Sequence, residues 1–377
     1  MADRWLWQHP DWPRFRWNLE ALAGSLGQAR KAQGRLLMVR DLLDPGLAKE
    51  ALAAVLKAEG ISTSAIEGEH LNPESVAASI ARRLGIPSPA RAPLSLNADG
   101  LASVLIDAVE SYRAALTIDR LCAWQKALLE GGPARFHPVV IGALRPGEVV
   151  VQSGAFGQEV THFQGVPRGN LARDLDGFLA WYNASPGSLD GLIRAGIAHL
   201  WFVTIHPFED GNGRLTRALT DRAIAQDEDS PLCLFRMSTR ILEVRSEYYA
   251  ALNGAQAIGA GLDITPWLAW FLTQTERACR NCEGTLRNTL AKAKFWARHR
   301  ADPINDRQRK ALNNLLDSGP EGFEGGLTNR KYVAMAKVGA ATAYRDIEEL
   351  VGHGCLVQRP GRGRSTSYDL PWDDLFR

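Results

Sequence analysis

The sequence has few cysteines, almost no net charge and no long apolar run, and each absence argues against a class of protein. The five cysteines among its 377 residues are scattered, which argues against the disulfide framework of a small secreted protein. A formal net charge of +2 means that any contact with DNA would come from a locally basic part. The longest apolar stretch, around residues 195–205, is interrupted by His199 and falls short of the ~20 residues that span a membrane.

The N-terminus also lacks the run of about 7–15 apolar residues that a secretory signal contains. Together with the missing membrane span, this leads us to expect a soluble, cytoplasmic protein that makes no contact with a membrane.

Length and composition predict a globular protein of more than one domain. Domains usually contain ~100–200 residues, so 377 residues predict two or three of them. The apolar fraction of 45% and the charged fraction of 23% are typical of soluble proteins. A proline-rich stretch at residues 84–93 is typical of a linker. We therefore expect a helical domain over residues 1–85, a larger core over residues 94–298 and a small module over residues 303–377.

The spacing of apolar residues predicts a mainly α chain with one β-hairpin in the middle and another near the end. A β-branched run at residues 149–153, a turn at 154–157 and a returning run at 159–163 predict the first hairpin. A strongly apolar helix is expected over residues 189–205, and a second helix over residues 214–226.

The last part of the chain has the element order of a winged-helix module. Helical patterns at residues 307–316, 328–336 and 340–351 precede short strand-like pieces around a turn at residues 359–364. Arginines of this turn could contact DNA phosphates, namely Arg359, Arg362 and Arg364. Acidic residues in the middle of the expected recognition helix oppose that contact: Asp346, Glu348 and Glu349. DNA binding and a docking or dimerisation role both stay open.

The segment HPFEDGNGRLTR, residues 206–217, is the most informative in the chain. A helix is expected to end near His206 and another to begin near Gly213, with a glycine-containing loop between them. Main-chain N–H groups at a helix N-terminus have no partner within the helix and carry the positive end of its dipole. Gly211 and Gly213 allow this backbone to approach an anion closely, and the Asn212 amide can add a donor. The segment therefore predicts a phosphate cradle.

Charged side chains in the same segment favour nucleotide chemistry. Arg214 and Arg217 lie three residues apart, so one helical face offers two guanidinium groups to phosphate oxygens. Asp210 supplies a hard carboxylate oxygen suited to Mg²⁺. His206 is the only nearby side chain that can accept a proton near neutral pH without extreme tuning. Together these groups predict phosphoryl or nucleotidyl transfer.

This segment resembles the signature of the Fic family, HPFx[D/E]GNGRxxR, at every specified position. Fic enzymes are helical proteins that bind ATP with Mg²⁺ and usually transfer AMP to Ser, Thr or Tyr of a target protein. The resemblance implies that His206 is the general base and that Asp210 holds Mg²⁺ between the α- and β-phosphates. It also implies that residues 211–213 cradle the phosphates, with Arg217 on the γ-phosphate and Arg214 as a further nucleotide-binding residue.

Two other stretches resemble parts of the Fic core. SEYYAAL, residues 246–252, resembles the stretch in which a tyrosine pair flanks the adenine, although such a pair could also simply pack in the core. The residues implied at the adenine are Tyr248, Tyr249 and Gln256. The hairpin edge from Val151 to Gly154 resembles the family's flap, against which the target segment lies as an added strand.

TSAIEG, residues 63–68, resembles the inhibitory motif [S/T]xxxE[G/N] of some Fic proteins. The resemblance implies that Glu67 pairs with Arg217 in the place of the γ-phosphate, so that ATP binds in an unproductive pose, and Thr63 is the first residue of the motif. An alternative needs no regulation, because Ser64 and Glu67 also fit a helix capping box.

The start of the chain resembles the uncharacterised N-terminal domain that precedes some bacterial Fic cores. The whole resemblance implies a protein adenylyltransferase that uses ATP and Mg²⁺, modifies a hydroxyl-bearing protein and is held at low activity by Glu67. Removal of AMP from a modified protein, with Glu67 positioning a water, is one alternative. Another is a DNA-binding regulator whose Fic core only senses ATP, although sensing would not need His206. Formation of a homodimer stays open.

Overall fold

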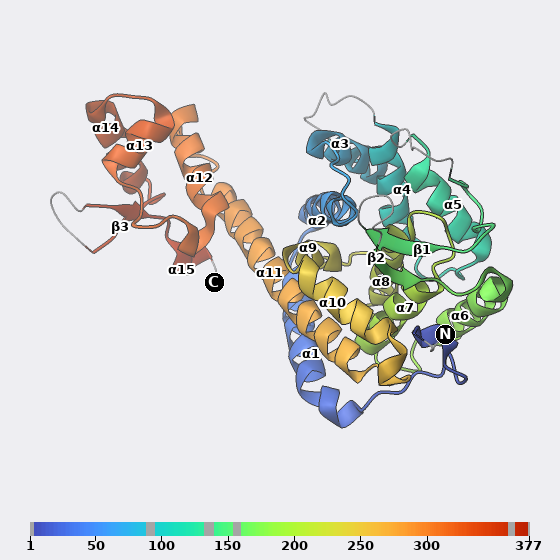
Figure 1. Ribbon diagram of the computed structural model, residues 1–377. Helices are drawn as coiled ribbons and strands as arrows, with labels where there is room; N and C mark the ends of the chain where they lie inside the picture. Colours follow the sequence, from blue (N-terminus) through green and yellow to red (C-terminus); the bar gives the residue numbers. More distant parts are fainter. Residues whose placement is uncertain (1–3, 88–94, 132–138, 154–159, 361–365, 376–377) are drawn as a thin grey trace. The chain divides into compact units, whose positions relative to one another are not determined.

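The computed structural model describes residues 4–87, 95–131, 139–153, 160–360 and 366–375 (Figure 1). Most of these residues are helical, and the described strands form two small antiparallel hairpins, which confirms the expected mainly α class. The chain divides into two compact units, Met1–Cys282 and Glu283–Arg377. None of the described helices combines the length and the apolar character needed to cross a membrane.

The first unit carries the candidate site. Its strands are β1 (Val150–Ser153) and β2 (Val160–Gln164), and short 3-10 turns lie at η1 (Leu6–Gln8), η2 (Arg168–Asn170) and η3 (Ile258–Ala260). Its helices are α1 (Leu19–Asp41), α2 (Pro45–Ile66), α3 (Pro73–Leu84), α4 (Leu96–Glu110), α5 (Ile118–Leu129), α6 (Leu171–Ala184), α7 (Gly191–Ile205), α8 (Asn212–Asp227), α9 (Met237–Glu243), α10 (Arg245–Gln256) and the first part of α11 (Thr265–Arg298).

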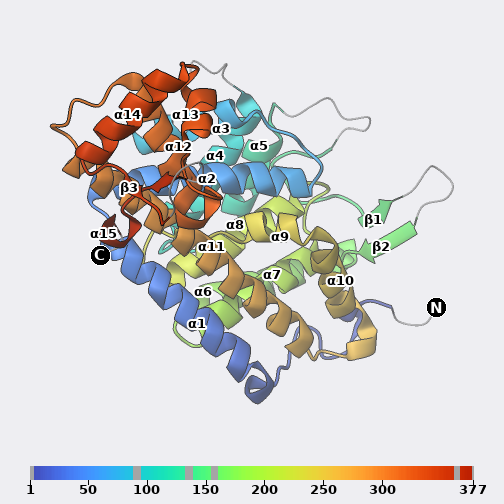
Figure 2. The same cartoon turned by 90° about the vertical axis from the view of Figure 1, so that its left-hand side faces the viewer.

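Helices α7 and α8 form the centre of the first unit and pack side by side (Figure 2). Every residue of α7 is buried, as its apolar sequence predicts. Asp190 caps its N-terminus by accepting a hydrogen bond from the main-chain N–H of Leu192 at 3.0 Å. The helix ends where His206 adopts a left-handed conformation, φ 54° and ψ 61°, directly before Pro207, which has no N–H to continue the helix.

Helices α2, α3, α4 and α5 pack against one another in chain order, and α2 also contacts α8 and α9. These contacts bring the C-terminal end of α2 beside α8, although the two helices are far apart in the sequence (Figure 1). Residues before 85 and after 94 therefore share one packed unit. The expected boundary between them stays a prediction, and most of the expected linker lies outside the described residues.

The aromatic residues near the N-terminus join this unit by ring contacts. The rings of Trp12 and Phe15 meet the ring of Trp201 on α7 edge to face, with centroids 6.4 Å and 5.7 Å apart. The ring of Trp5 meets Phe163 on β2 in the same manner at 5.3 Å. The N-terminal segment thus packs against both α7 and the hairpin.

The second unit, taken by itself, is a small helical module with one hairpin. Beyond the end of α11 it contains α12 (Asp306–Gly322), α13 (Asn329–Ala336), α14 (Ala340–Gly352), β3 (Val357–Gln358), β4 (Tyr368–Asp369) and α15 (Trp372–Leu375). Buried apolar side chains of these elements form its core, among them Leu312, Leu315, Tyr332, Ile347 and Leu350. The element order is the expected one, and the winged-helix interpretation stays a prediction.

One expected surface charge of this module is turned inward. Asp346 on α14 is buried and accepts hydrogen bonds from the Tyr332 hydroxyl at 2.8 Å and from Arg307 Nε at 3.2 Å. Its carboxylate therefore connects α14 to α12 and α13, and its charge does not contribute to an acidic outer face. Arg362 and Arg364, which the sequence suggests for DNA phosphates, lie outside the described residues.

Candidate active site

His206 is held at the end of α7 in a conformation that leaves one ring nitrogen free to act as a base. A left-handed backbone costs a residue with a side chain about 1–2 kcal/mol, so the surrounding contacts must hold it. Its Nδ1 lies 3.1 Å from the carbonyl oxygen of Val203. Because a carbonyl only accepts hydrogen bonds, Nδ1 carries the proton and Nε2 keeps its lone pair.

The surroundings of His206 keep this imidazole neutral. Burial lowers its pKa to about 4, and the positive charge of Arg145 acts in the same direction. The Val203 carbonyl and the carboxylates of Glu67 and Asp210 oppose that shift. At neutral pH the ring is therefore uncharged and can accept a proton at Nε2.

The loop that follows His206 leads into the N-terminus of α8. Gly211 caps this helix with φ 90°, a left-handed conformation that glycine adopts without steric cost. Asn212 is buried: its side-chain oxygen accepts from the N–H of Phe208 at 3.0 Å, and its amide donates to the carbonyl of Phe208 at 2.8 Å. The side chain of Asn212 thus closes the loop, so the donors that remain for an anion are main-chain N–H groups of the first turn.

The end of α2 places a carboxylate in this cradle. Glu67 Oε1 lies 2.7 Å from Nη2 of Arg217, and only 2.1 Å from the point where a Cβ on Gly213 would stand. The Thr63 hydroxyl accepts from Arg217 Nε at 2.6 Å, and the Thr63 carbonyl accepts from Nη2 at 3.0 Å. Since Glu67 is the C-terminal cap of α2, the capping-box alternative, which requires a helix N-terminus, is wrong.

The other arginine of the segment is paired in the same way. Nη1 of Arg214, whose side chain is nearly buried, lies 2.7 Å from Oε2 of Glu69, and its Nη2 lies 3.7 Å from Oδ1 of Asp210. The turn after α2 positions Glu69: Gly68 has φ 81°, and the Glu69 N–H donates to the carbonyl of Ser64 at 2.9 Å. Both arginines expected at the phosphates therefore contact carboxylates that follow α2.

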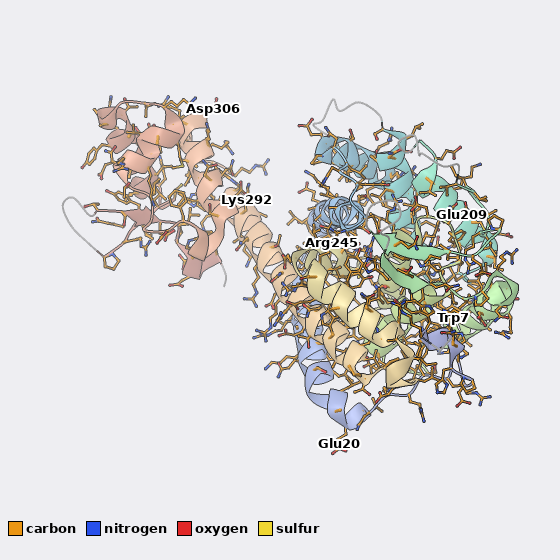
Figure 3. All side chains as sticks on the ribbon, in the orientation of Figure 1. Trp7, Glu20, Glu209, Arg245, Lys292 and Asp306 are labelled. Carbon is orange, nitrogen blue, oxygen red and sulfur yellow. The ribbon has the colours of Figure 1, made fainter. Side chains whose placement is uncertain are left out.

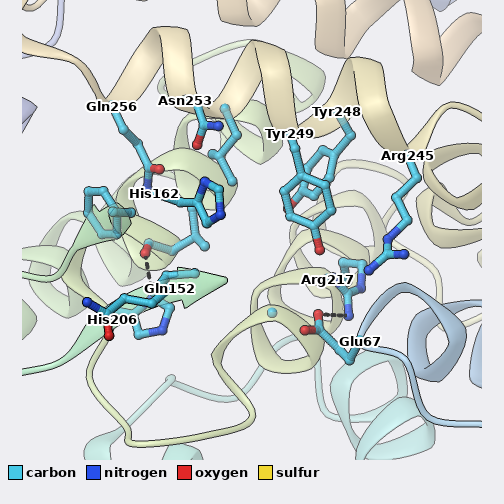
Figure 4. Close-up of a pocket in the computed structure, with 15 residues that line it drawn as sticks. Glu67, Gln152, His162, His206, Arg217, Arg245, Tyr248, Tyr249, Asn253 and Gln256 are labelled. Atoms are coloured by element: carbon cyan, nitrogen blue, oxygen red, sulfur yellow. Dashed lines mark hydrogen bonds and ion pairs between the residues drawn. The ribbon is translucent and has the colours of Figure 1, made fainter. Parts of the chain in front are cut away.

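A cavity of about 470 Å³ opens beside Glu67 and Arg217 (Figure 4). In Figure 4, His206 and Gln152 lie on one side of it, the pair of Glu67 and Arg217 on another, and Asn253 and Gln256 at the far end. Of the residues expected from the sequence, several line the cavity: Glu67, Val151, His206, Gly213, Arg217, Tyr248, Tyr249 and Gln256. Others lie in the adjoining loop and helices: Thr63, Asp210, Gly211, Asn212 and Arg214.

The two tyrosines of α10 occupy different environments. Tyr248 is buried, and its hydroxyl lies 3.0 Å from Nε2 of His199; burial raises the pKa of this phenol. Tyr249 is 36% exposed at the cavity, with its ring centroid 5.1 Å from that of Tyr248. Gln256 is buried, and its amide donates to the Thr204 hydroxyl at 3.2 Å. A planar nucleobase in the cavity would therefore stack on the accessible ring of Tyr249 more readily than on the buried ring of Tyr248.

The hairpin of β1 and β2 forms one wall of the cavity. The strands are antiparallel, with a bulge between Val151 and Gln152, and Val151 is 37% exposed. The N-terminal segment, which carries the Trp7 labelled in Figure 3, covers part of β2, because Trp7 Nε1 donates to the carbonyl of Gln164 at 2.7 Å. The outer edge of β1 is thus the better candidate for pairing with an added strand. Gly154, expected at the same edge, lies outside the described residues.

The expected Mg²⁺ site depends on Asp210. Its side chain is 38% exposed beside the first turn of α8. One accessible carboxylate next to the expected phosphate cradle fits Mg²⁺, which nucleotide sites usually bind through one or two carboxylates together with phosphate oxygens and waters. The neighbouring Glu209 is used structurally, because its Oε2 accepts from the N–H of Val140 at 2.7 Å.

Comparisons with known proteins indicate the family of the segment that carries this site. Residues 115–224 match the model of the Fic/DOC family, and residues 5–86 match a domain of unknown function (DUF4172). The chain is 29% identical over 153 residues to the protein adenylyltransferase fic-1 of Caenorhabditis briggsae, covering 40% of this chain and 26% of that protein. It is 30% identical over 176 residues to the protein adenylyltransferase Fic of Nematostella vectensis, covering 46% and 35%. The matches therefore span about a quarter to a third of these relatives.

Solved structures support the fold. A Fic family protein from Desulfovibrio desulfuricans G20 matches with a TM-score of 0.52 at 19% identity, over 93% of this chain and 95% of that one. A Fic domain containing signaling protein from Bacteroides thetaiotaomicron VPI-5482 matches with a TM-score of 0.51 at 17% identity, over 71% and 97%. The chain therefore contains a Fic domain, which confirms the resemblance read from residues 206–217.

Several residues of the site are absent from the sequence-based expectations. Glu69 could have been suspected, because it is the second carboxylate after α2. Arg245 directly precedes the stretch with the tyrosine pair and lines the cavity, with its guanidinium carbon 5.6 Å from the ring centroid of Tyr249. Arg145 has no comparable signal, because its partners are main-chain carbonyls and two of them, at Val166 and His206, are distant in the sequence.

Proposed function

We propose that this protein transfers AMP from ATP to a hydroxyl group of a target protein, and that Glu67 keeps this activity low. One observation carries the proposal: the chain's own carboxylate lies at Gly213 and Arg217, at the N-terminus of α8. A site that accepts a carboxylate between a guanidinium and a helix N-terminus has the chemistry to accept a phosphate. The names of the curated relatives support the nucleotidyl reaction.

His206 would act as the general base. Its Nε2 would take the proton of the target's Ser, Thr or Tyr hydroxyl, and the hydroxyl oxygen would attack the α-phosphorus in line. A new oxygen–phosphorus bond forms, the bond from the α-phosphorus to the oxygen bridging to the β-phosphate breaks, and pyrophosphate leaves. The neutral ring with Nδ1 already protonated supports this role.

The phosphates would lie on the main-chain N–H groups of residues 211–213, with Arg214 and Arg217 holding the outer oxygens. This arrangement requires both guanidinium groups to exchange their carboxylate partners, Glu69 and Glu67, for phosphate oxygens. Asp210 would hold Mg²⁺, which supplies positive charge to the phosphates when bound. Residues of α10 would enclose the adenine of ATP, with Tyr249 as the accessible aromatic ring.

The target segment would pair with the free edge of β1 next to Val151, through main-chain hydrogen bonds. Such pairing positions a hydroxyl near His206 but depends little on the identity of the side chains. The proposal therefore covers Ser, Thr and Tyr alike.

The test is to weigh the intact protein after incubation with ATP and Mg²⁺. Glu67→Gly is expected to gain the mass of one AMP per modified site, and the double variant with His206→Ala to gain none. His353→Ala, at an exposed histidine of the second unit, is the matched control and should modify itself as the Glu67→Gly parent does. A gain of phosphate would assign a kinase-like reaction. No gain, with ATP bound and purified candidate targets also unmodified, would reject AMP transfer.

A further inference from the structure

Arg145 is a fully buried cation outside the set of residues that would bind the nucleotide. Its guanidinium donates to three main-chain carbonyl groups from separate segments. Nη1 donates to Gly147, before β1, at 2.6 Å, and Nη2 donates to Val166, after β2. Nε donates to His206 at 2.8 Å. One side chain thus joins both ends of the hairpin to the residue that would act as the base.

The backbone of Arg145 adds a fourth connection. Its main-chain N–H donates to the carbonyl of Pro207 at 3.0 Å. Arg145 therefore binds two consecutive carbonyls at the left-handed turn that ends α7. Left-handed backbone at a residue with a side chain persists only where its surroundings over-determine it, and Arg145 supplies two of those constraints.

The end of the hairpin also packs closely against His206. Gly165, the residue after β2, has no room for a side chain: an added Cβ would lie 3.0 Å from Cβ of His206 and 2.8 Å from Cγ1 of Val149. The N–H of Gly165 donates to the carbonyl of Val149 at 3.1 Å. Any shift of the hairpin base relative to the turn would therefore move His206, and Arg145 spans this contact.

The chemistry of Arg145 indicates positioning more than stability. Among the described residues, no carboxylate forms an ion pair with its guanidinium within 4.0 Å. Burial lowers the pKa of this group, and the more distant charge of Glu148 only opposes that shift. An unpaired buried cation is costly, and a well-packed apolar side chain would often serve stability equally well. A planar guanidinium can direct N–H groups to three carbonyls at fixed angles, which the single ammonium of lysine cannot do.

We propose that Arg145 is a positioning residue for the transfer reaction. It holds the hairpin, on which the target segment would lie, at a fixed distance and orientation relative to the imidazole of His206. The inference rests on the proposed function. It concerns the alignment of the target hydroxyl with the base, and leaves the binding of ATP to other residues.

The first test measures modification and ATP binding separately in the Glu67→Gly background. Arg145→Met and Arg145→Lys are expected to lower kcat about 100-fold, the loss expected for a misplacement of about 1 Å, while the Kd for ATP changes less than about twofold. Arg168→Met, at an exposed arginine near the hairpin base, is the matched control and should keep the parent kcat. An unchanged kcat, or a loss of kcat matched by an equal loss of ATP affinity, would overturn the proposal.

The second test does not require the enzyme to be active. Diethyl pyrocarbonate modifies accessible neutral imidazoles, and peptide mass mapping reports the rate at each histidine. In the full chain without nucleotide, Arg145→Met should raise the rate at His206 severalfold and leave the rate at the exposed His353 unchanged. Equal rates at His206 in both proteins would refute the positioning role. If this rate rises while the Glu67→Gly parent binds ATP and adds no AMP to itself or to purified candidate targets, AMP transfer fails, and only the structural part of the inference, that Arg145 holds His206 in place, stands.

Discussion

Replacing Glu67 by glycine is the perturbation that the structure addresses most directly. The substitution removes the carboxylate from the position beside Gly213 and frees the guanidinium of Arg217, while the bonds from Arg217 to Thr63 can remain. A phosphate oxygen can then take the place of Glu67 Oε1. We therefore expect Glu67→Gly to raise the rate of self-modification.

The size of the increase follows from the contact that is lost. The hydrogen bond of 2.7 Å joins a buried guanidinium to a carboxylate that is 33% exposed. Hydrogen bonds to charged groups contribute about 1.5–3 kcal/mol, and the exposure of Glu67 places this one near 2 kcal/mol. Since ~1.4 kcal/mol is a tenfold change, the cradle would be free in roughly 1 in 30 molecules. Glu67→Gly should therefore increase the rate about 30-fold.

The assay is the initial rate of self-modification with ATP labelled at the α-phosphate, at saturating ATP and Mg²⁺. Glu50→Gln, which removes a charge from an exposed position of α2, is the control and should leave the rate at the parent value. The inhibitory role of Glu67 is wrong if Glu67→Gly binds ATP, melts at the parent temperature and remains as inactive as the parent protein.

Three further results are expected. Glu69→Gln removes the charged partner of Arg214 and should raise the rate of self-modification severalfold. The increase should be smaller than for Glu67→Gly, because Glu69 does not occupy the position beside Gly213. A rate below that of the parent would contradict this. The pKa of His206 is lowered to about 4, so the kcat/KM of Glu67→Gly should stay level from pH 8 to about pH 6 and fall at lower pH, where His206 becomes protonated. An apparent pKa near 6.5 in this profile would instead show an unshifted imidazole. Gly213→Ala places a methyl group in the cradle, so calorimetry should detect at least tenfold weaker ATP binding even in the Glu67→Gly background; unchanged affinity would place the phosphates elsewhere.

Features that depend on neighbouring residues were predictable from the sequence. The helix expected over residues 189–205 is Gly191–Ile205 in the structure, and the one expected over residues 214–226 is Asn212–Asp227. A continuous apolar run, a proline after its end and two glycines in the following loop act through short-range backbone sterics. The main-chain donors at the N-terminus of α8, on which the proposed phosphate cradle depends, follow from the same local chemistry.

The use of individual polar groups was less predictable. The amide of Asn212 looks like a phosphate donor in the sequence, yet it is bonded within its own loop to Phe208. Both tyrosines of the pair line the cavity, but burial separates Tyr248 from Tyr249. The sequence contains the donors and acceptors, whereas burial decides which of them a ligand can reach.

By itself the sequence determined the fold class, the Fic domain and the loop on which the proposed chemistry depends, because helix ends, glycines and apolar runs act over a few residues. Only the tertiary structure decided which carboxylate meets which arginine: Glu69 reaches Arg214 across 145 positions of the chain. It also decided that Arg145 binds the carbonyl of His206, 61 positions away. Such pairings arise from the packing of α2 and the hairpin against α7 and α8, and no pattern of neighbouring residues encodes them.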